Sequence, residues 1–332
     1  MLSYRHAFHA GNHADILKHI SLMLVLEAMC KKEKPFTAID CNAGAGFYYL
    51  DDECSLKTGE ATDGILKLTE RWKECRQKGD MTESALDRYI NLVMPYVKDG
   101  KYPGSPEIIR TFLRGDGTRP PASQDFADRA VLMELHNTEI DILKSRIIDS
   151  RISIHHRDCY EGLKALTPPE VRRGFLLMDP SYEVASDYTN VASVLTGTQK
   201  RWNVGVQLLW YPLLHHRTSE LEQMLDSIQA AAERKGLETF TQELILHPME
   251  KTEFMEKTEG ESGREIRGEI RGKIGRETDS LNEDDVERCG DETNKGYGLY
   301  GSGMLFVNPP YRLQEELASA IEEVTAIFSA SE

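Results

Sequence analysis

Residues 174–182, Gly-Phe-Leu-Leu-Met-Asp-Pro-Ser-Tyr, decide the fold class of this chain. The apolar run Gly174 to Met178 is typical of a strand that is buried on both faces of a parallel sheet. The run ends abruptly in Asp179, Pro180, Ser181 and Tyr182. Because open α/β sheets bind ligands at the carboxyl ends of their strands, this stretch predicts a central strand that leads into a functional loop.

A second apolar run, Phe36 to Asp40, leads in the same way into the small residues of Cys41 to Gly46. Further strand-like runs alternate with helical patterns along the chain, and this alternation predicts a parallel α/β sheet. We expect seven strands in a doubly wound, mostly parallel sheet whose last strand is antiparallel. The expected strands are 36–40, 131–135, 152–156, 174–178, 204–210, 239–246 and 304–307.

Composition bounds the class of protein. The chain has 332 residues with 40% apolar content, which is enough for a substantial core. No apolar run approaches the roughly 18 residues of a membrane span, so we expect a cytoplasmic protein with no membrane partner. The six cysteines form no Cys-x-x-Cys pair and are expected to be reduced thiols. A formal charge of −15 argues against a broad nucleic-acid-binding surface, although local basic patches remain compatible with a small RNA footprint.

Two segments depart from the strand-and-helix alternation of what we expect to be a single domain over 1–332. Residues 50–101 carry helical apolar stripes and are more than one crossover helix needs, so they predict an inserted helical subdomain. Residues 250–297 are charged and internally repetitive, as in Arg-Glu-Ile-Arg-Gly-Glu-Ile-Arg-Gly over 264–272. Such a composition cannot bury enough apolar surface to offset chain entropy, so it predicts a disordered insert.

The loop at 41–46 and two acids indicate a cofactor site. Small residues let the backbone approach a ligand closely, although a tight strand-to-helix turn explains them equally well. Glu134 ends the second strand, where a carboxylate can accept both hydroxyls of a ribose. Asp158 follows the third, where it can accept an adenine amine. Either acid alone fits a solvated loop residue or a helix cap.

The loop after Met178 carries groups that can act on a nucleobase. The Asp179 carboxylate and the Pro180 carbonyl can accept hydrogen bonds from a base amine, which localises its lone pair toward a methyl donor. Tyr182 can stack on an extruded base. The alternative is an Asp-Pro turn with a core tyrosine. A rival motif, Asn308-Pro-Pro-Tyr311, follows the seventh strand and is interpreted as a structural turn.

The N-terminal segment Tyr4 to His19 is histidine-rich and looks too polar for a core. A metal site through His9 and His13 is a minor hypothesis, because Gly11 and Asn12 should interrupt the helix that would align them; no metal is expected. Lys18 and His19 could meet a carboxylate or phosphate, and an isolated Lys18 would be an exposed charge.

Several strings together resemble the RlmJ family of 23S rRNA adenine methyltransferases over nearly the whole chain except the charged insert. They are Met1 to His19, Asn42 to Gly46, Tyr102 to Pro106, Glu134 to His136, Arg172 to Gly174, Asp179 to Glu183, Trp210 to Pro212, Ser302 to Met304 and Asn308 to Pro310. The resemblance implies a Rossmann-like class I fold and S-adenosylmethionine-dependent methylation of the exocyclic N6 amine of one adenine in 23S rRNA. The expected partner is large-subunit rRNA, protein-free or in an early assembly intermediate.

The resemblance also implies residue roles. Asp179 would be the catalytic acceptor, and Tyr4, Pro180 and Tyr182 would contact the substrate. The cofactor would be bound by Lys18, His19, Asn42, Ser105, Glu134, Asp158 and Cys159. Asn42 replaces a common histidine and Ser181 replaces a second proline of the catalytic loop. Two alternatives stay open: a non-catalytic RNA-binding or assembly relative, and an adenine methyltransferase that acts on DNA.

Overall fold

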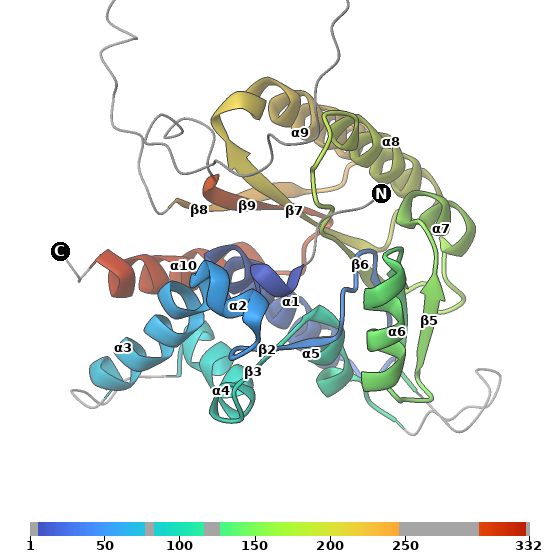
Figure 1. Cartoon of the computed structure of the whole chain (residues 1–332). Helices are drawn as coiled ribbons and strands as arrows, with labels where there is room; N and C mark the ends of the chain where they lie inside the picture. The colour runs from blue at the N-terminus through green and yellow to red at the C-terminus, as the bar shows by residue number, and fades with distance from the viewer. Residues whose placement is uncertain (1–5, 77–82, 116–126, 246–298, 330–332) are drawn as a thin grey trace, which may run out of the picture.

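A seven-stranded sheet forms the centre of the molecule (Figure 1). The computed structural model describes residues 6–76, 83–115, 127–245 and 299–329. The strand order is β5 (Ile152–His156), β4 (Arg129–Glu134), β1 (Thr37–Asp40), β6 (Gly174–Met178), β7 (Val206–Leu214), β9 (Leu299–Val307) and β8 (Thr239–Ile245). Strand β9 runs antiparallel to both of its neighbours, β7 and β8, and the other neighbouring pairs of this sheet are parallel. The predicted seven-stranded, mostly parallel α/β sheet is therefore confirmed.

Strands β7 and β9 are longer than predicted. Pro212, Gly301 and Gly303 are residues that usually end strands, yet all three lie within the β7–β9 pairing. Gly303 faces the Tyr211 ring, where an added Cβ would lie 2.2 Å from a ring atom. The glycine therefore makes room for a buried tyrosine, which a strand pattern alone does not reveal.

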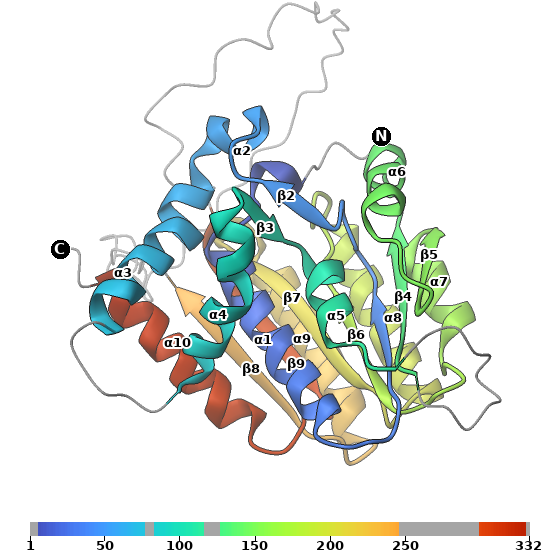
Figure 2. The same cartoon turned by 90° about the horizontal axis from the view of Figure 1, so that it is seen from below.

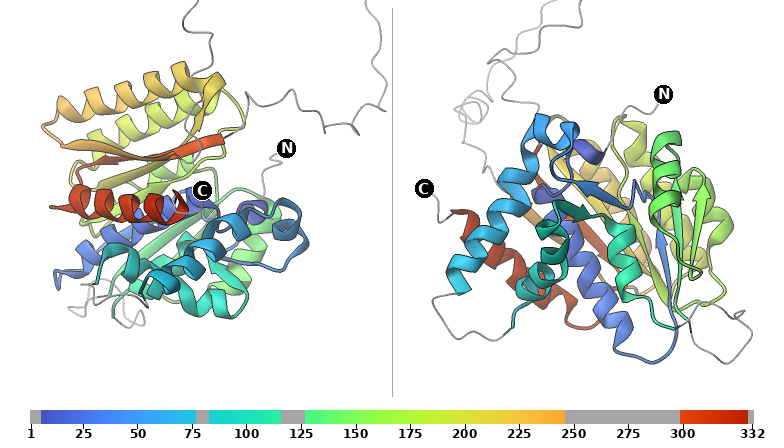
Figure 3. Two further views of the ribbon diagram at one scale, coloured as in Figure 1. Left: turned by 90° about the vertical axis from the view of Figure 1, so that its left-hand side faces the viewer. Right: turned by 60° about the horizontal axis from the view of Figure 1, so that its bottom comes forward.

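Successive side chains of β6 point to opposite faces of the sheet and enter two separate apolar clusters. Leu177 belongs to one cluster, and Leu176 and Met178 to the other. Three helices pack over the face of Leu176: α7 (Cys159–Leu166), α8 (Ser186–Arg201) and α9 (Thr218–Glu233), which follows the short η3 (His215–Arg217). The other face is covered by α1 (His13–Cys30), α5 (Ser105–Phe112) and α10 (Leu313–Ser329) (Figure 3). Helix α6 (Asn137–Arg146) contacts the edge strand β5.

Helix α1 is buried on almost every side, because it packs against the sheet as well as against α4, α5 and α10. The expectation that the polar N-terminal segment lies outside the core is wrong for its helical part. Asp15, Lys18 and His19 are at most 5% exposed. These polar groups are tolerated because they pair with one another and with groups from distant parts of the chain.

The N-cap of α1 confirms the predicted break before this helix. Asn12 accepts a hydrogen bond from the Asp15 backbone N–H, and Gly11 adopts a φ of +81° that favours glycine. Helix α1 therefore begins at His13, after a short turn of helix η1 (His6–Phe8). His9 and His13 do not share a helix.

The described residues within 50–101 form four helical elements between β1 and β4 (Figure 2). They are α2 (Glu53–Thr58), the π-helical turn η2 (Thr62–Leu66), α3 (Lys67–Arg76) and α4 (Ala85–Lys98). They are flanked by β2 (Phe47–Tyr49) and β3 (Lys101–Pro103), which pair antiparallel in a second small sheet. This pair of strands, which the helical insertion connects and which we call the β2–β3 hairpin below, was not predicted from the sequence. The charged segment 250–297 lies outside the described residues.

The Asn308-Pro-Pro-Tyr311 turn lies at the edge of the sheet opposite to Asp179. Val307 pairs with Gln207 near the start of β7, whereas Asp179 follows the end of β6. Tyr311 is 91% exposed. The motif thus lies away from the carboxyl ends of the parallel strands, and its interpretation as a structural turn stays a prediction.

Candidate active site

A cavity of about 380 Å³, called the main cavity below, lies at the carboxyl ends of β1, β4, β5 and β6. It is lined by all of the predicted site residues that the structure describes, except Tyr182. Those lining residues are Lys18, His19, Asn42, Ser105, Glu134, Asp158, Cys159, Asp179 and Pro180. They come from parts of the chain that are far apart in sequence, and the sheet brings them together because parallel strands end at one edge.

Glu134 fixes the loop that follows β1. Its Oε2 accepts the Gly44 backbone N–H at 2.7 Å, and its Oε1 accepts the His136 backbone N–H at 2.7 Å. Gly44 has a φ of +59°, and an added Cβ would lie 2.2 Å from the Tyr48 hydroxyl. Each carboxylate oxygen has a further lone pair, so Glu134 can still accept hydroxyl donors from a ligand.

Asp158 is the N-cap of α7. Its Oδ1 accepts the backbone N–H groups of Tyr160 at 2.7 Å and Glu161 at 3.1 Å. The helix-cap interpretation of this acid is thus correct, and it is compatible with a ligand contact because the side chain also lines the cavity. Burial raises the pKa of the adjacent Cys159 thiol to about 12, so this cysteine stays protonated at neutral pH.

Asp179 is held by contacts with helix α1 and with the loop that follows β1. Its Oδ2 lies 2.5 Å from Lys18 Nζ, and its backbone N–H donates to Asn42 Oδ1 at 3.2 Å. Asn42 therefore joins the loop after β1 to the loop after β6. Within the described residues, Asp179 Oδ1 has no hydrogen-bond partner and can accept one from a ligand.

Lys18 lies between two carboxylates. Its Nζ is 2.8 Å from Asp15 Oδ1 as well as 2.5 Å from Asp179 Oδ2. Burial disfavours its charged form, but the two carboxylates outweigh burial and raise the pKa of Lys18 well above its usual value. Burial likewise opposes the charge of Asp15, and nearby His6 and Lys18 outweigh it and hold the Asp15 pKa well below its usual value. The interpretation of Lys18 as an exposed charge is excluded.

Asp15 and Asp40 also lie at the site, but they were not predicted from the sequence. Asp15 is three residues before Lys18 on α1, a spacing that predicts an ion pair on one helix face. Asp40 ends β1 and is fully buried, and its Oδ1 accepts the Asn42 backbone N–H at 3.3 Å. Burial raises the pKa of Asp40 to about 6. The position of Asp40 at the end of an apolar strand is the sequence feature that could have predicted it.

His19 presents a buried nitrogen beside the cavity. Its Nδ1 lies 2.8 Å from the Tyr102 hydroxyl, and that hydroxyl lies 2.8 Å from the Tyr89 hydroxyl. The other ring nitrogen, Nε2, is buried and has no hydrogen-bond partner among the described residues. Burial lowers the pKa of His19 to about 3, so the ring is neutral at physiological pH.

Tyr182 is not placed as expected. Its side chain is 6% exposed and packs against Tyr188 and Trp210, with ring centroids 4.7 and 6.1 Å away. Its hydroxyl donates to the Trp210 carbonyl at 3.0 Å. A φ of +53° turns the residue away from the path of the loop residues that line the cavity, so in this structure the ring belongs to the core and supports the loop. Tyr4 lies outside the described residues.

The N-terminal histidines are engaged by other groups. His9 Nδ1 lies 2.9 Å from Glu60 Oε1, and the His13 ring meets Phe328 edge-on at 4.5 Å. Over residues 6–76, 83–115, 127–245 and 299–329, no three His, Cys, Asp or Glu side chains form a group that could hold a metal ion. In the same part of the chain, no helix is long and apolar enough to cross a membrane.

The fold and the position of this cavity define a Rossmann-like class I methyltransferase architecture. The family description "Ribosomal RNA large subunit methyltransferase D, RlmJ" matches residues 33–259. Ribosomal RNA large subunit methyltransferase J of Escherichia coli (strain K12) is 33% identical over 97% of this chain and 92% of its own length. The Haemophilus influenzae (strain Rd) protein of the same name is 31% identical over 98% and 93%.

The chain therefore belongs to the RlmJ family of ribosomal RNA large subunit methyltransferases. A crystal structure of a Legionella pneumophila protein is similar in fold, with a TM-score of 0.71 and 24% identity over 98% of this chain and 96% of that one. Family membership and fold agree with the resemblance that the sequence motifs indicated.

Proposed function

We propose that this chain transfers a methyl group from S-adenosylmethionine to the exocyclic N6 amine of a single adenine in large-subunit rRNA. The observation that supports this best is the placement of Asp179 and Pro180 at the end of β6, in the same cavity as Glu134 and Asp158. Asp179, which can accept a hydrogen bond from a base amine, thus lines the same cavity as Glu134 and Asp158, which suit a nucleoside.

The residues present fit the cofactor. A cavity of about 380 Å³ is in the range of small-molecule sites, and the Gly44 backbone approaches it without a side chain. Glu134 would accept the ribose hydroxyls, and Asp158 and Cys159 would lie beside the adenine. Lys18 and His19 would meet the carboxylate, with Asn42 and Ser105 lining the rest. When bound, the cofactor supplies a methyl group on a sulfonium that leaves as a neutral thioether.

Asp179 and Pro180 would prepare the acceptor. The lone pair of an adenine amine is delocalised into the ring, so the amine is a weak nucleophile. Hydrogen bonds from the amine to Asp179 Oδ1 and to the Pro180 carbonyl would localise the lone pair, and the carboxylate can take the proton that the methylated amine releases. Lys18 on Oδ2 holds the carboxylate in place for this step.

The substrate would be an unpaired or extruded adenine, because its amine cannot reach a recessed acceptor from within a duplex. We propose large-subunit rRNA, protein-free or in an early assembly intermediate, as the partner, and the cytoplasm as the place of reaction. The names of the E. coli and H. influenzae relatives support this substrate.

Transfer of labelled methyl from S-adenosylmethionine to protein-free large-subunit rRNA tests the proposal. Asp179→Asn keeps the shape of the side chain and should reduce transfer by roughly 100-fold or more, the usual scale of a general base. Lys200→Gln, an exposed cation on α8, serves as the matched control. Cofactor binding without transfer to rRNA would favour a non-catalytic RNA-binding or assembly protein. Transfer to DNA instead of rRNA would favour an adenine methyltransferase that acts on DNA.

A further inference from the structure

One face of the β2–β3 hairpin carries aromatic and cationic side chains together. Phe47 and Tyr49 are two residues apart on β2 and so share a face, and Lys101 is paired with Tyr49 across the hairpin. Arg146 reaches the same rings from α6. We call these four residues the hairpin face. Tyr48 and Tyr102, on the opposite face, are buried.

The contacts within the hairpin face are close. The Phe47 and Tyr49 rings meet edge-on with centroids 5.6 Å apart. Lys101 Nζ lies 5.5 Å from the Phe47 centroid and 5.7 Å from that of Tyr49. The Arg146 guanidinium lies 4.3 and 5.5 Å from the same two centroids. The face is thus a preformed cluster, with Tyr49 42% exposed.

Arg146 differs from most half-buried arginines of the described residues. Arg76, Arg88 and Arg114, for example, each pair with a carboxylate. Arg146 donates to the backbone carbonyls of Ala45 and Phe47, and neither it nor Lys101 forms an ion pair with a carboxylate of the described residues. In a chain with a net charge of −15, two such cations beside exposed aromatic surface mark a local site for a polyanion.

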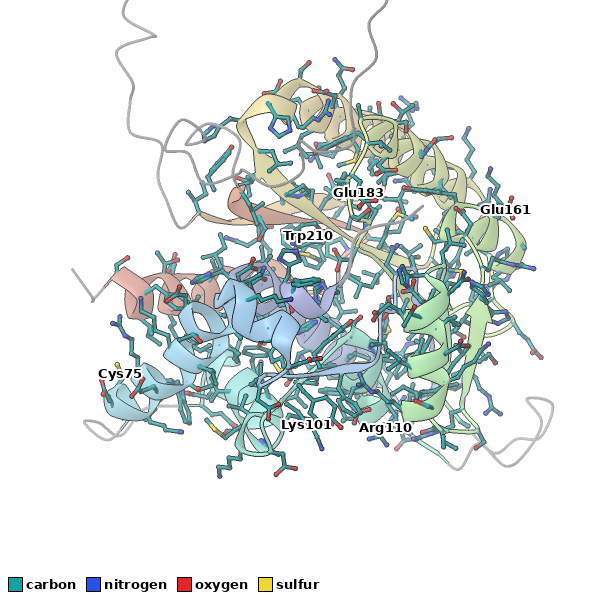
Figure 4. All side chains as sticks on the ribbon, viewed as in Figure 1. Cys75, Lys101, Arg110, Glu161, Glu183 and Trp210 are labelled. Atoms are coloured by element: carbon teal, nitrogen blue, oxygen red, sulfur yellow. The ribbon has the colours of Figure 1, made fainter. Side chains whose placement is uncertain are left out.

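The hairpin face is continuous with the candidate active site. A second hollow of about 120 Å³ is lined by Tyr49 and Arg146, and Tyr48 and Glu139 line both this hollow and the main cavity. Figure 2 shows β2 and β3 at the front of the molecule, between α4 and α6. Figure 4 shows Lys101 at the lower edge of its view, away from Trp210.

We infer that the hairpin face binds a single-stranded nucleotide of the RNA that flanks the target adenine. One base stacks on Tyr49, and the adjoining phosphates contact Lys101 and Arg146. Asp52 and Glu139, which also line the hollow, suit the amine and imino donors of a base edge and repel a phosphate there. This inference rests on the proposed function and adds to it a contact outside the cavity.

The test compares Tyr49→Ala, Tyr49→Trp and Lys101→Gln in full-length protein. Loss of one stacked base should raise both the Kd for an unpaired rRNA fragment and the KM for RNA by about 10-fold in Tyr49→Ala, and tryptophan should restore them. Cofactor affinity and kcat at saturating RNA should stay unchanged. Lys101→Gln should lower the slope of log affinity against log salt by about 0.7. Tyr311→Ala, an exposed aromatic at the opposite edge of the sheet, is the control.

The two levels of the proposal fail differently. If wild type transfers methyl groups to rRNA but Tyr49→Ala has the same RNA affinity and KM, the hairpin face does not bind RNA while the proposed function stands. If Tyr49→Ala weakens RNA binding but the wild type transfers nothing, the hairpin face is supported and the catalytic proposal fails. Equal loss in Tyr49→Ala and Tyr311→Ala would also overturn the inference, because binding would then be unspecific.

Discussion

Lys18 Nζ lies 2.5 Å from Asp179 Oδ2, so a lysine of the first helix is paired with the carboxylate that follows the central strand β6. Asp15 holds the same ammonium from the other side at 2.8 Å. Because Lys18 and Asp15 are almost fully buried, this triad joins the stability of α1 to the geometry of the acceptor. The structure thus gives Lys18 a role toward Asp179 in addition to the proposed cofactor contact.

Removal of the Lys18 charge should destabilise the folded chain. It should also abolish methyl transfer, because Asp179 loses the cation that holds its carboxylate in place. Lys18→Met leaves two carboxylates facing each other in a buried site, so we expect a loss of about 3–5 kcal/mol in the free energy of unfolding. Urea titration at pH 7 measures it, with Lys200→Met as the exposed control. A loss below about 1 kcal/mol would show that the pair is not strongly desolvated.

Asp40 should make the protein less stable as the pH rises. Its pKa is raised to about 6 by burial, so the folded state binds the proton more tightly than the unfolded chain does. Its contribution to stability is therefore fully present below pH ~4 and is lost as the pH rises through about 6. Asp40→Asn keeps an acceptor for the Asn42 N–H and should remove this loss.

The measurement is the free energy of unfolding of both proteins at pH 5 and pH 8. The difference between variant and wild type should grow toward pH 8, by an amount on the order of 1–3 kcal/mol. Equal stability differences at the two pH values would contradict the assignment to Asp40.

The tyrosine pair behind His19 should fix which ring nitrogen carries the proton. The buried Tyr89 hydroxyl has Tyr102 as its hydrogen-bond partner within the described residues, so it donates to Tyr102, and Tyr102 donates to His19 Nδ1. The proton of the neutral ring is then on Nε2, beside the cavity. Nitrogen NMR should show this tautomer, and Tyr89→Phe should destabilise it and weaken cofactor binding. An Nδ1-protonated ring in wild type would refute this order of donors.

Tyr182 should act through stability, because its hydroxyl donates to the Trp210 carbonyl inside the core. Tyr182→Phe should lower the free energy of unfolding by about 1 kcal/mol while kcat changes little. Thermal unfolding and steady-state transfer assays measure the two effects, and Tyr311→Phe is the exposed control. A large fall in kcat with unchanged stability would instead indicate a direct contact with substrate.

The sequence predicted the sheet because each buried strand is an apolar run that ends in polar or small residues. It also predicted which loops meet, since Asn42, Glu134, Asp158 and Asp179 all follow parallel strands. The strand ends were less accurate where Gly301 and Pro212 lie inside the sheet. A doubly wound topology can thus be predicted from the sequence, because each of its strands and loops is indicated by a short run of neighbouring residues.

The remaining features depend on long-range pairing or on single backbone angles. Burial of Lys18 requires Asp179, which the sequence alone cannot place beside α1. The orientation of Tyr182 depends on one φ of +53° in a loop where every other residue faces the cavity or the solvent. The β2–β3 hairpin pairs only three residues on each strand across the helical insertion, too short for a periodic pattern.

Identification of the modified nucleoside tests the central claim most directly. Large-subunit rRNA should be treated with S-adenosylmethionine and either wild type or Asp179→Asn, digested to nucleosides and analysed by mass spectrometry against authentic standards. We predict N6-methyladenosine at a single position with wild type and a loss of roughly 100-fold or more with the variant. Methylation at a ring nitrogen or a ribose hydroxyl, or equal N6-methyladenosine with both proteins, would contradict the account.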